Sequence, residues 1–180
     1  MFIIMLRLRI LLWLNWKKNK LVKILGLDPS LSSTGWGIIE ASNNRLTYIA
    51  DGFIPTDAKL PIEQRLDIIY RTLCNVIETY KPDEVSIEQT FLNSNPASSL
   101  KLSMARGVVV LSAGSYNLPL TEYEPNKVKK ATVGVGRAEK SQVETMVKIL
   151  LPTAKPKNND SADALAIAIT HAHFRTALKK

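Results

Sequence analysis

The chain has 180 residues, 46% of them apolar and 22% charged, with a formal net charge of +8. This length is enough for one domain with a substantial core, and the composition excludes a disordered chain. Its one cysteine, Cys74, excludes an intramolecular disulfide framework and lies in a helical pattern as a small apolar residue. A reducing compartment fits this cysteine content.

Residues 1–20 are apolar and basic and contain no acid. Arg7 and Arg9 interrupt the apolar run, which falls far short of the roughly 20 residues that span a bilayer. The segment also lacks the small-residue cleavage site of a signal peptide. An amphipathic anchor at a membrane surface remains open. We favour an extension that precedes the native domain, with residues 21–180 as a single domain and Leu21 as a non-standard start.

Three strands are predicted first. Val22 to Leu27 is a continuous apolar-rich run, typical of a central strand, and residues 34–40 and 45–54 carry β-branched and aromatic side chains. The polar residues 42–44 between the last two runs indicate a turn. This pattern predicts an antiparallel meander.

Helices and strands then alternate. Apolar residues at steps of three and four predict a helix from Pro61 to the residues before Pro82. We expect strands at 84–89 and 119–125, helices at 96–117, 126–133, 139–151 and 161–178, and a loop at 152–160. The natural packing is an α/β fold with a five-stranded mixed sheet flanked by helices on both faces.

Charge is distributed unevenly along the chain. Residues 21–100 have a net charge of −4, and residues 101–157 have a net charge of +6. An acidic half beside a basic half suits a site that holds metal while it binds an anionic polymer. The alternative is a solvated surface with uneven charge.

Four acids occupy places where a metal site can form. Asp28 and Glu88 end predicted strands, and Asp160 and Asp163 share one face at the start of the last helix. Parallel neighbouring strands would bring Asp28 and Glu88 to one edge of the sheet. Clustered carboxylates require cations, and oxygen ligands select Mg²⁺ or Mn²⁺. Two such ions about 3.5–4 Å apart are a standard arrangement for phosphodiester hydrolysis.

Each acid also has a plainer interpretation. Asp28 can belong to a simple Asp-Pro-Ser turn, and Glu88 can be a solvated acid at a strand end. Asp160 can be a helix N-cap with Asp163 in the first turn, where the helix dipole favours both.

Four blocks in order, from about Leu21 to Phe174, resemble one family. They are "ILGLDPS…TGWGII", "IEQTFLNSNPASSLKLSMARG", "GVGRAEKSQV" and "DSADALAIAITHAH". The chain resembles the RuvC family of Holliday-junction resolvases, bacterial endonucleases with a ribonuclease H-like fold. The family commonly has glycine after Asp-Pro, where this chain has Ser30.

The resemblance implies roles for seven residues. Asp28, Glu88, Asp160 and Asp163 match the catalytic metal-binding acids, and Lys129 and Lys140 match basic positions of DNA contact or catalysis. Phe91 matches an aromatic position for junction binding, where it would stack on a distorted base. A lysine at position 140 would lie near the scissile phosphate. His171 and His173 lie too far along the last helix to join the same metals, so we expect them to be structural.

The resemblance also implies an activity and partners. A homodimer would nick two strands of like polarity in a four-way DNA junction during recombination and repair. Each site would use two Mg²⁺ ions, for which Mn²⁺ may substitute, and leave a 5′-phosphate and a 3′-hydroxyl. The helix over 96–117 is a candidate dimer interface, and its alternative is ordinary packing on the sheet. The expected setting is the cytoplasm, with a branch-migration complex of the other Ruv proteins and without a membrane.

Three other functions are compatible with parts of the sequence. An actin-like ATPase shares the first turn but needs a second phosphate loop and usually a duplicated domain. A junction-binding protein without catalysis is disfavoured because all four acids are present. A related ribonuclease H-like nuclease that acts on another nucleic-acid substrate is the remaining alternative.

Overall fold

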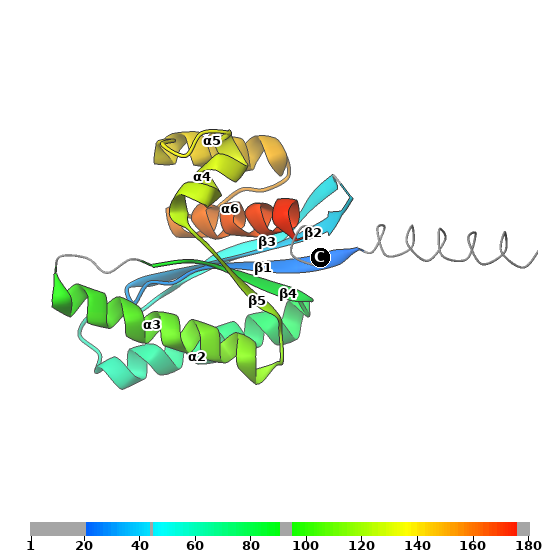
Figure 1. The fold of residues 1–180 in the computed structure, drawn as a ribbon. Helices are drawn as coiled ribbons and strands as arrows, with labels where there is room; N and C mark the ends of the chain where they lie inside the picture. Colours follow the sequence, from blue (N-terminus) through cyan, green and yellow to red (C-terminus); the bar gives the residue numbers. More distant parts are fainter. Residues whose placement is uncertain (1–20, 44, 91–94, 176–180) are drawn as a thin grey trace, which may run out of the picture.

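The computed structural model of the chain describes residues 21–43, 45–90 and 95–175. It confirms the expected α/β fold, a five-stranded mixed sheet with helices on both faces (Figure 1). The predicted extension over 1–20 lies outside the described residues. Within the described part of the chain, no helix is long and apolar enough to cross a membrane.

The sheet combines an antiparallel meander with a parallel pair. Its strands are β1 (Val22–Asp28), β2 (Ser33–Ser42), β3 (Arg45–Pro55), β4 (Glu84–Glu88) and β5 (Leu120–Tyr123). They lie in the order β3-β2-β1-β4-β5, with β1–β2 and β2–β3 antiparallel and β1–β4 and β4–β5 parallel. The central strands β1 and β4 are buried on both faces over most of their length, as is typical of parallel neighbours.

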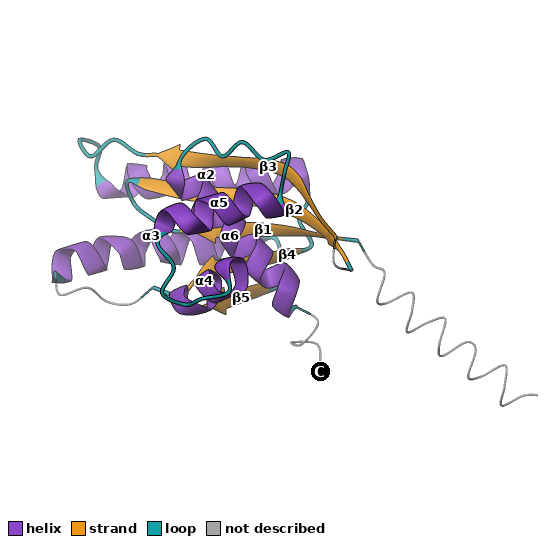
Figure 2. Ribbon diagram, turned by 90° about the horizontal axis from the view of Figure 1, so that it is seen from above, coloured by secondary structure: helices purple, strands orange, loops and turns teal. Residues whose placement is uncertain are grey.

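Helices cover the two faces unequally. On one face lie α2 (Ile62–Tyr80) and α3 (Pro96–Ser115). On the other, α6 (Asn159–Phe174) packs on the sheet and is itself covered by α4 (Pro125–Val133) and α5 (Lys140–Leu150), as Figures 1 and 2 show. Two apolar cores result, one on each side of the sheet. The predicted elements are confirmed, with ends that differ by a few residues.

Helix α6 is buried on nearly every side. It lies between the sheet and the α4–α5 layer, so alanines and aliphatic residues surround its axis. Beneath it, Gly26 of β1 and Gly35 and Gly37 of β2 present bare backbone. A methyl group on Gly26 would overlap the Ala164 carbonyl, and one on Gly35 would overlap the backbone of Asp160. The three glycines therefore let α6 approach the sheet closely.

This close approach gives a stability prediction. Gly26→Ala should lower the free energy of unfolding by about 3 kcal/mol, because the helix must move to relieve the overlap. Urea unfolding followed by circular dichroism measures the change. Gly136→Ala is the control, because its methyl group would meet nothing closer than 3.5 Å. Equal stability of the two variants would contradict this account of α6 packing.

Candidate functional site

The register of the sheet places two of the four predicted acids side by side. Leu27 of β1 pairs with Ile87 of β4 in a parallel ladder, and Asp28 and Glu88 are the next residues in each strand. Both carboxylates therefore lie at the carboxyl edge of the sheet. This edge is where open α/β sheets bind their ligands.

The start of α6 brings the other two acids to the same edge. Gly35 pairs with Asp28 across β1 and β2, and the backbone of Asp160 lies directly against Gly35. Asp163 follows one turn later on the same face. The helix cap is Asn158, whose side chain accepts from Ser161 N in a reciprocal capping box.

The alternative that Asp160 is the N-cap is therefore wrong. Its carboxylate instead accepts hydrogen bonds from the Ser33 hydroxyl and from Asn158 Nδ2, the latter at 2.9 Å. Because Asn158 already caps the helix, Asp160 is not needed to satisfy the backbone donors of the first turn. Its carboxylate can take another partner without loss of the cap.

The turn after Asp28 is closed without glycine. Ser30 is not among the described residues with positive φ, so its backbone conformation suits a side chain. The buried Thr34 hydroxyl donates to the Ser30 carbonyl at 2.6 Å and accepts from Ser30 N at 3.3 Å. The next residue of the turn, Leu31, is held as well. Its carbonyl accepts hydrogen bonds from Thr56 Oγ1 at 2.5 Å and from the buried Arg65 at 3.3 Å. Side chains thus fix the turn that follows Asp28.

The four carboxylates interact electrostatically. Burial, and then the charges of Asp163, Glu88 and Asp160, raise the pKa of Asp28 from its ordinary 3.8 to about 8. Burial and the charge of Asp163 also raise the pKa of Glu88, and burial raises that of Asp163. The structure therefore brings these acids together at the cost of mutual repulsion.

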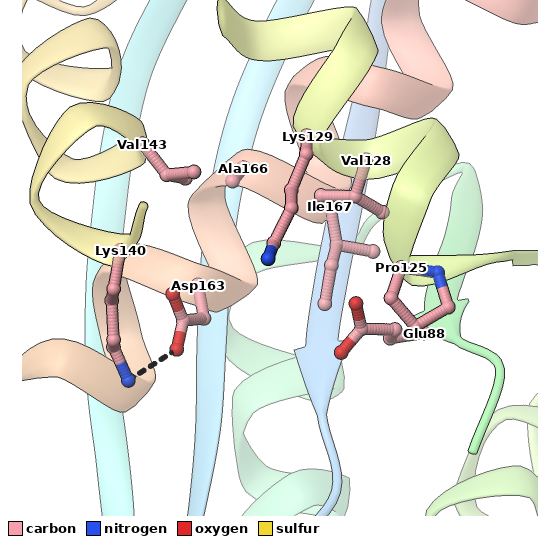
Figure 3. Close-up of a pocket in the computed structure, with 9 residues that line it drawn as sticks. All are labelled: Glu88, Pro125, Val128, Lys129, Lys140, Val143, Asp163, Ala166 and Ile167. Carbon is pink, nitrogen blue, oxygen red and sulfur yellow. Dashed lines mark ion pairs between the residues drawn. The ribbon is translucent and has the colours of Figure 1, made fainter. Parts of the chain in front are cut away.

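Two lysines offset part of this repulsion. Lys140 Nζ forms an ion pair with Asp163 Oδ2 at 2.8 Å, and this contact raises the lysine pKa. Lys129 enters from α4, and its charge lowers the pKa of Glu88. Figure 3 shows the Lys129 side chain pointing between Glu88 and Asp163. Both lysines and both acids line one pocket of about 290 Å³.

The donor set suits a hard divalent cation. It consists of carboxylates whose charge is only partly neutralised, and none of the described residues that line the pocket is a cysteine or a histidine. Among the described residues, no group of three or more potential ligands is already gathered about a common point. Asp163 is paired with Lys140, and Asp160 with Ser33 and Asn158. Asp160 and Asp163 would have to turn away from these partners to bind a metal.

Two further predictions have different outcomes. Phe91 lies outside the described residues, so its role stays a prediction. His171 is buried at the far end of α6, where its Nε2 lies 2.9 Å from Glu84 Oε2 and its Nδ1 lies 2.8 Å from the Tyr123 hydroxyl. Its expected structural role is confirmed.

Sequence reasoning missed the residues that support the acids. Ser33 and Asn158 bind Asp160, and Thr34 closes the turn after Asp28. Asn158 was the one with a local signal, since asparagine is among the preferred residues at a helix N-cap. The contact of Thr34 with Ser30 is also local but follows no recognised motif, and the contact of Ser33 with Asp160 depends on how distant segments pack.

The raised pKa of Asp28 predicts a pH dependence of stability. Between pH 4 and pH 8 the folded metal-free protein holds a proton that the unfolded chain releases, so stability falls as pH rises through this range. Asp28→Asn should flatten this decline and raise the melting temperature at pH 8 by about 5 °C. Thermal unfolding in EDTA at several pH values measures it. Asp57→Asn, an exposed acid outside the site, should behave like the wild type. A decline of wild-type size in Asp28→Asn would contradict the burial of a repelled charge.

Known proteins resemble this chain over most of its length. The model of the family described as crossover junction endodeoxyribonuclease RuvC matches residues 24–171. A crossover junction endodeoxyribonuclease RuvC of Azorhizobium caulinodans is 50% identical over 157 residues, which are 87% of this chain and 93% of that protein. One of Rhodopseudomonas palustris is 50% identical over 156 residues, 87% of this chain and 90% of that protein.

Solved structures agree in fold. Thermus thermophilus RuvC in complex with a Holliday junction substrate has a TM-score of 0.81 and 28% identity, over 87% of this chain and 96% of that one. The yeast mitochondrial Holliday junction resolvase Ydc2 has a TM-score of 0.62 at 14% identity, over 87% of this chain and 81% of that one, and shows a shared fold. The chain belongs to the crossover junction endodeoxyribonuclease RuvC family.

Proposed function

We propose that the protein is a structure-selective endonuclease that resolves four-way DNA junctions by metal-dependent hydrolysis of phosphodiester bonds. The single observation that carries the proposal is the cluster of Asp28, Glu88, Asp160 and Asp163 at one sheet edge, in a chain of this family. The four carboxylates would hold two Mg²⁺ ions, or Mn²⁺ ions in their place. When bound, the metal supplies the activated water and stabilises the leaving oxygen.

The residues of the chain have separable tasks in this proposal. Asp28 and Glu88, fixed at the ends of two central strands, form the rigid part of the site. Asp160 and Asp163 approach from α6 and give up their internal partners for metal. Lys140, released from Asp163, would be free to contact the scissile phosphate. Lys129 would hold the same strand from the opposite wall of the pocket.

The basic segment beyond residue 100 would hold the DNA arms through their phosphates. Residues 101–157 carry a net charge of +6, and the lysines of the pocket belong to this segment. Phosphate contacts carry no base information, so junction shape would decide binding, which would weaken steeply with salt. Phe91, on the segment after Glu88, would stack on a distorted base.

A second copy of the chain is the proposed partner along α3. Leu100, Met104 and Leu111 are 58%, 38% and 58% exposed and follow heptad spacing with Gly107 and Gly114. This stripe lies opposite the buried face of α3, and a methyl group on either glycine would meet nothing within 4 Å. Apolar residues interrupted by bare backbone suit close packing against an identical helix.

The cellular setting completes the proposal. An enzyme for junctions formed in recombination and repair would act in the cytoplasm beside the chromosome. Its partners there would be the branch-migration complex of the other Ruv proteins. A two-fold dimer would give the paired nicks that resolve a junction symmetrically.

Junction cleavage tests the function directly. With Mg²⁺, the protein should place symmetric nicks in a synthetic four-way junction and leave linear duplex and RNA–DNA hybrid intact. Asp28→Asn should bind the junction with near wild-type affinity but cut it at least about 10³-fold more slowly, because the metal site loses a charged ligand. Gel-resolved cleavage and a binding titration on the same junction measure both.

The control is Asp57→Asn, which removes an exposed acid outside the site and should cut normally. Cleavage of the hybrid in preference to the junction would replace the proposal with the related ribonuclease H-like nuclease. Cleavage by Asp28→Asn at the wild-type rate would show that Asp28 is not a metal ligand.

The dimer interface has its own test. Leu111→Glu should convert the dimer to monomers, because a charge would be buried between two helices, and paired cleavage should fall with it. Sedimentation measures the association, and a cruciform plasmid distinguishes paired from single nicks. Ile149→Glu is the matched control, an equally exposed apolar residue on α5. A dimer that persists in Leu111→Glu, or dissociates only in Ile149→Glu, would exclude α3 as the interface.

A further inference from the structure

A buried acid lies outside the carboxylate cluster, on the edge strand β3. Asp51 is only 3% exposed, yet none of the ion pairs found in the described part of the chain includes it. Its two oxygens accept from neutral donors instead. Oδ1 accepts from the Tyr48 hydroxyl at 2.7 Å, and Oδ2 accepts from Lys157 N at 3.1 Å. A buried carboxylate is costly, so its retention here calls for a specific task.

A β-bulge aims Asp51 at the α6 side of the sheet. Ile38 pairs with Ala50 but Ile39 pairs with Tyr48, so Ile49 is an extra residue in β3. In a regular strand, residues three apart point to opposite faces. The extra residue reverses this parity, and Tyr48 and Asp51 therefore share one face. That face is the α6 side, because Asp51 pairs with Gly37, which contacts Leu165 of α6.

From this position Asp51 reaches the loop that leads into α6. Asp51 accepts a hydrogen bond from the backbone amide of Lys157, and Lys157 is the residue immediately before the helix cap Asn158. The side chain of Asn158 both caps α6 and donates to Asp160 Oδ2 at 2.9 Å. Asp51 is thus connected to Asp160 through its hydrogen bond to Lys157, the peptide bond from Lys157 to Asn158, and the hydrogen bond from Asn158 to Asp160.

We infer that Asp51 is a positioning residue of the metal site, which fixes the Lys157–Asn158 backbone so that Asp160 is presented to metal. The inference rests on the proposed metal-binding role of Asp160. Asp51 itself would touch neither metal nor DNA. It would act through the loop, as outer partners of metal ligands commonly do.

Two variants of nearly equal shape separate the hydrogen bond from packing. Asp51→Asn keeps an oxygen for Lys157 N and can donate its amide to the Tyr48 oxygen. Asp51→Leu keeps the number and branching of the side-chain heavy atoms, is somewhat bulkier, and loses every acceptor. Tyr48→Phe removes the second contact of Asp51 but leaves the one to the loop. We expect Asp51→Leu to be impaired in loop protection and metal affinity, and the other two variants to be near wild type in both.

Three measurements detect the effect of Asp51→Leu on the loop and on metal binding. Asp51→Leu should accelerate hydrogen exchange of the Lys157 amide by at least about tenfold, with little change at the buried amides of β1. Its Mn²⁺ affinity, followed by the electron paramagnetic resonance of free Mn²⁺, should fall by about tenfold. The half-saturating Mg²⁺ concentration for junction cleavage should rise by a similar factor, while junction affinity without divalent metal stays unchanged. Asp51→Asn should restore all three.

Each other outcome overturns the inference. Unchanged exchange at Lys157, or unchanged Mn²⁺ affinity, would show that the loop does not depend on Asp51. Uniformly faster exchange with normal metal affinity would make Asp51 a residue of general stability. If Asp51→Leu does not fold, Asp51→Ala takes its place with the same readouts. Exchange and Mn²⁺ binding need no cleavage, so failure of the proposed nuclease activity would be seen separately.

Discussion

The site depends on how closely α6 packs on the sheet. Gly26, Gly35 and Gly37 remove the side chains that would hold the helix away, and the backbone of Asp160 consequently lies against β2 beside Asp28. Had these positions carried even a methyl group, the helix would stand farther from the sheet and its two acids with it. The same contact that forms the core thus brings carboxylates from distant parts of the chain to one edge.

Close packing places several carboxylates near one another, and neighbouring side chains offset part of their mutual repulsion. Half-buried and repelled by its neighbours, Asp28 has a pKa of about 8, and the pKa values of Glu88 and Asp163 are raised as well. Lys140 pairs with Asp163, and Ser33 and Asn158 donate to Asp160. These contacts neutralise or solvate Asp163 and Asp160 and so offset part of the repulsion in the metal-free protein. They also define what a cation must displace to bind.

Helix α6 is held at both ends by buried polar groups. At its start, Asp51 binds the incoming loop. At its end, Glu84 lies 2.9 Å from His171 Nε2 and accepts from Arg175 Nε at 3.0 Å. Fully partnered buried polar groups specify one arrangement where apolar contacts alone permit sliding. A helix that carries two acids of the site on its first turns gains defined axial and rotational position from such contacts.

The sequence by itself determined the order of strands and helices, the two-faced α/β architecture and the four acids, because alternation, helical spacing and strand-end acids are local patterns. It also contained the motifs that indicate the family. Only the tertiary structure decided that Asn158 caps α6 rather than Asp160, that the backbone at Ser30 does not need the positive φ of a glycine, and that the bulge at Ile49 directs Asp51 toward α6. The cap and the turn are local contacts chosen among several candidate polar residues, whereas the bulge and the contact of Asp51 with Lys157 depend on segments that pairing and packing bring together. No local pattern of residue types encodes which distant backbone a glycine, hydroxyl or carboxylate will meet.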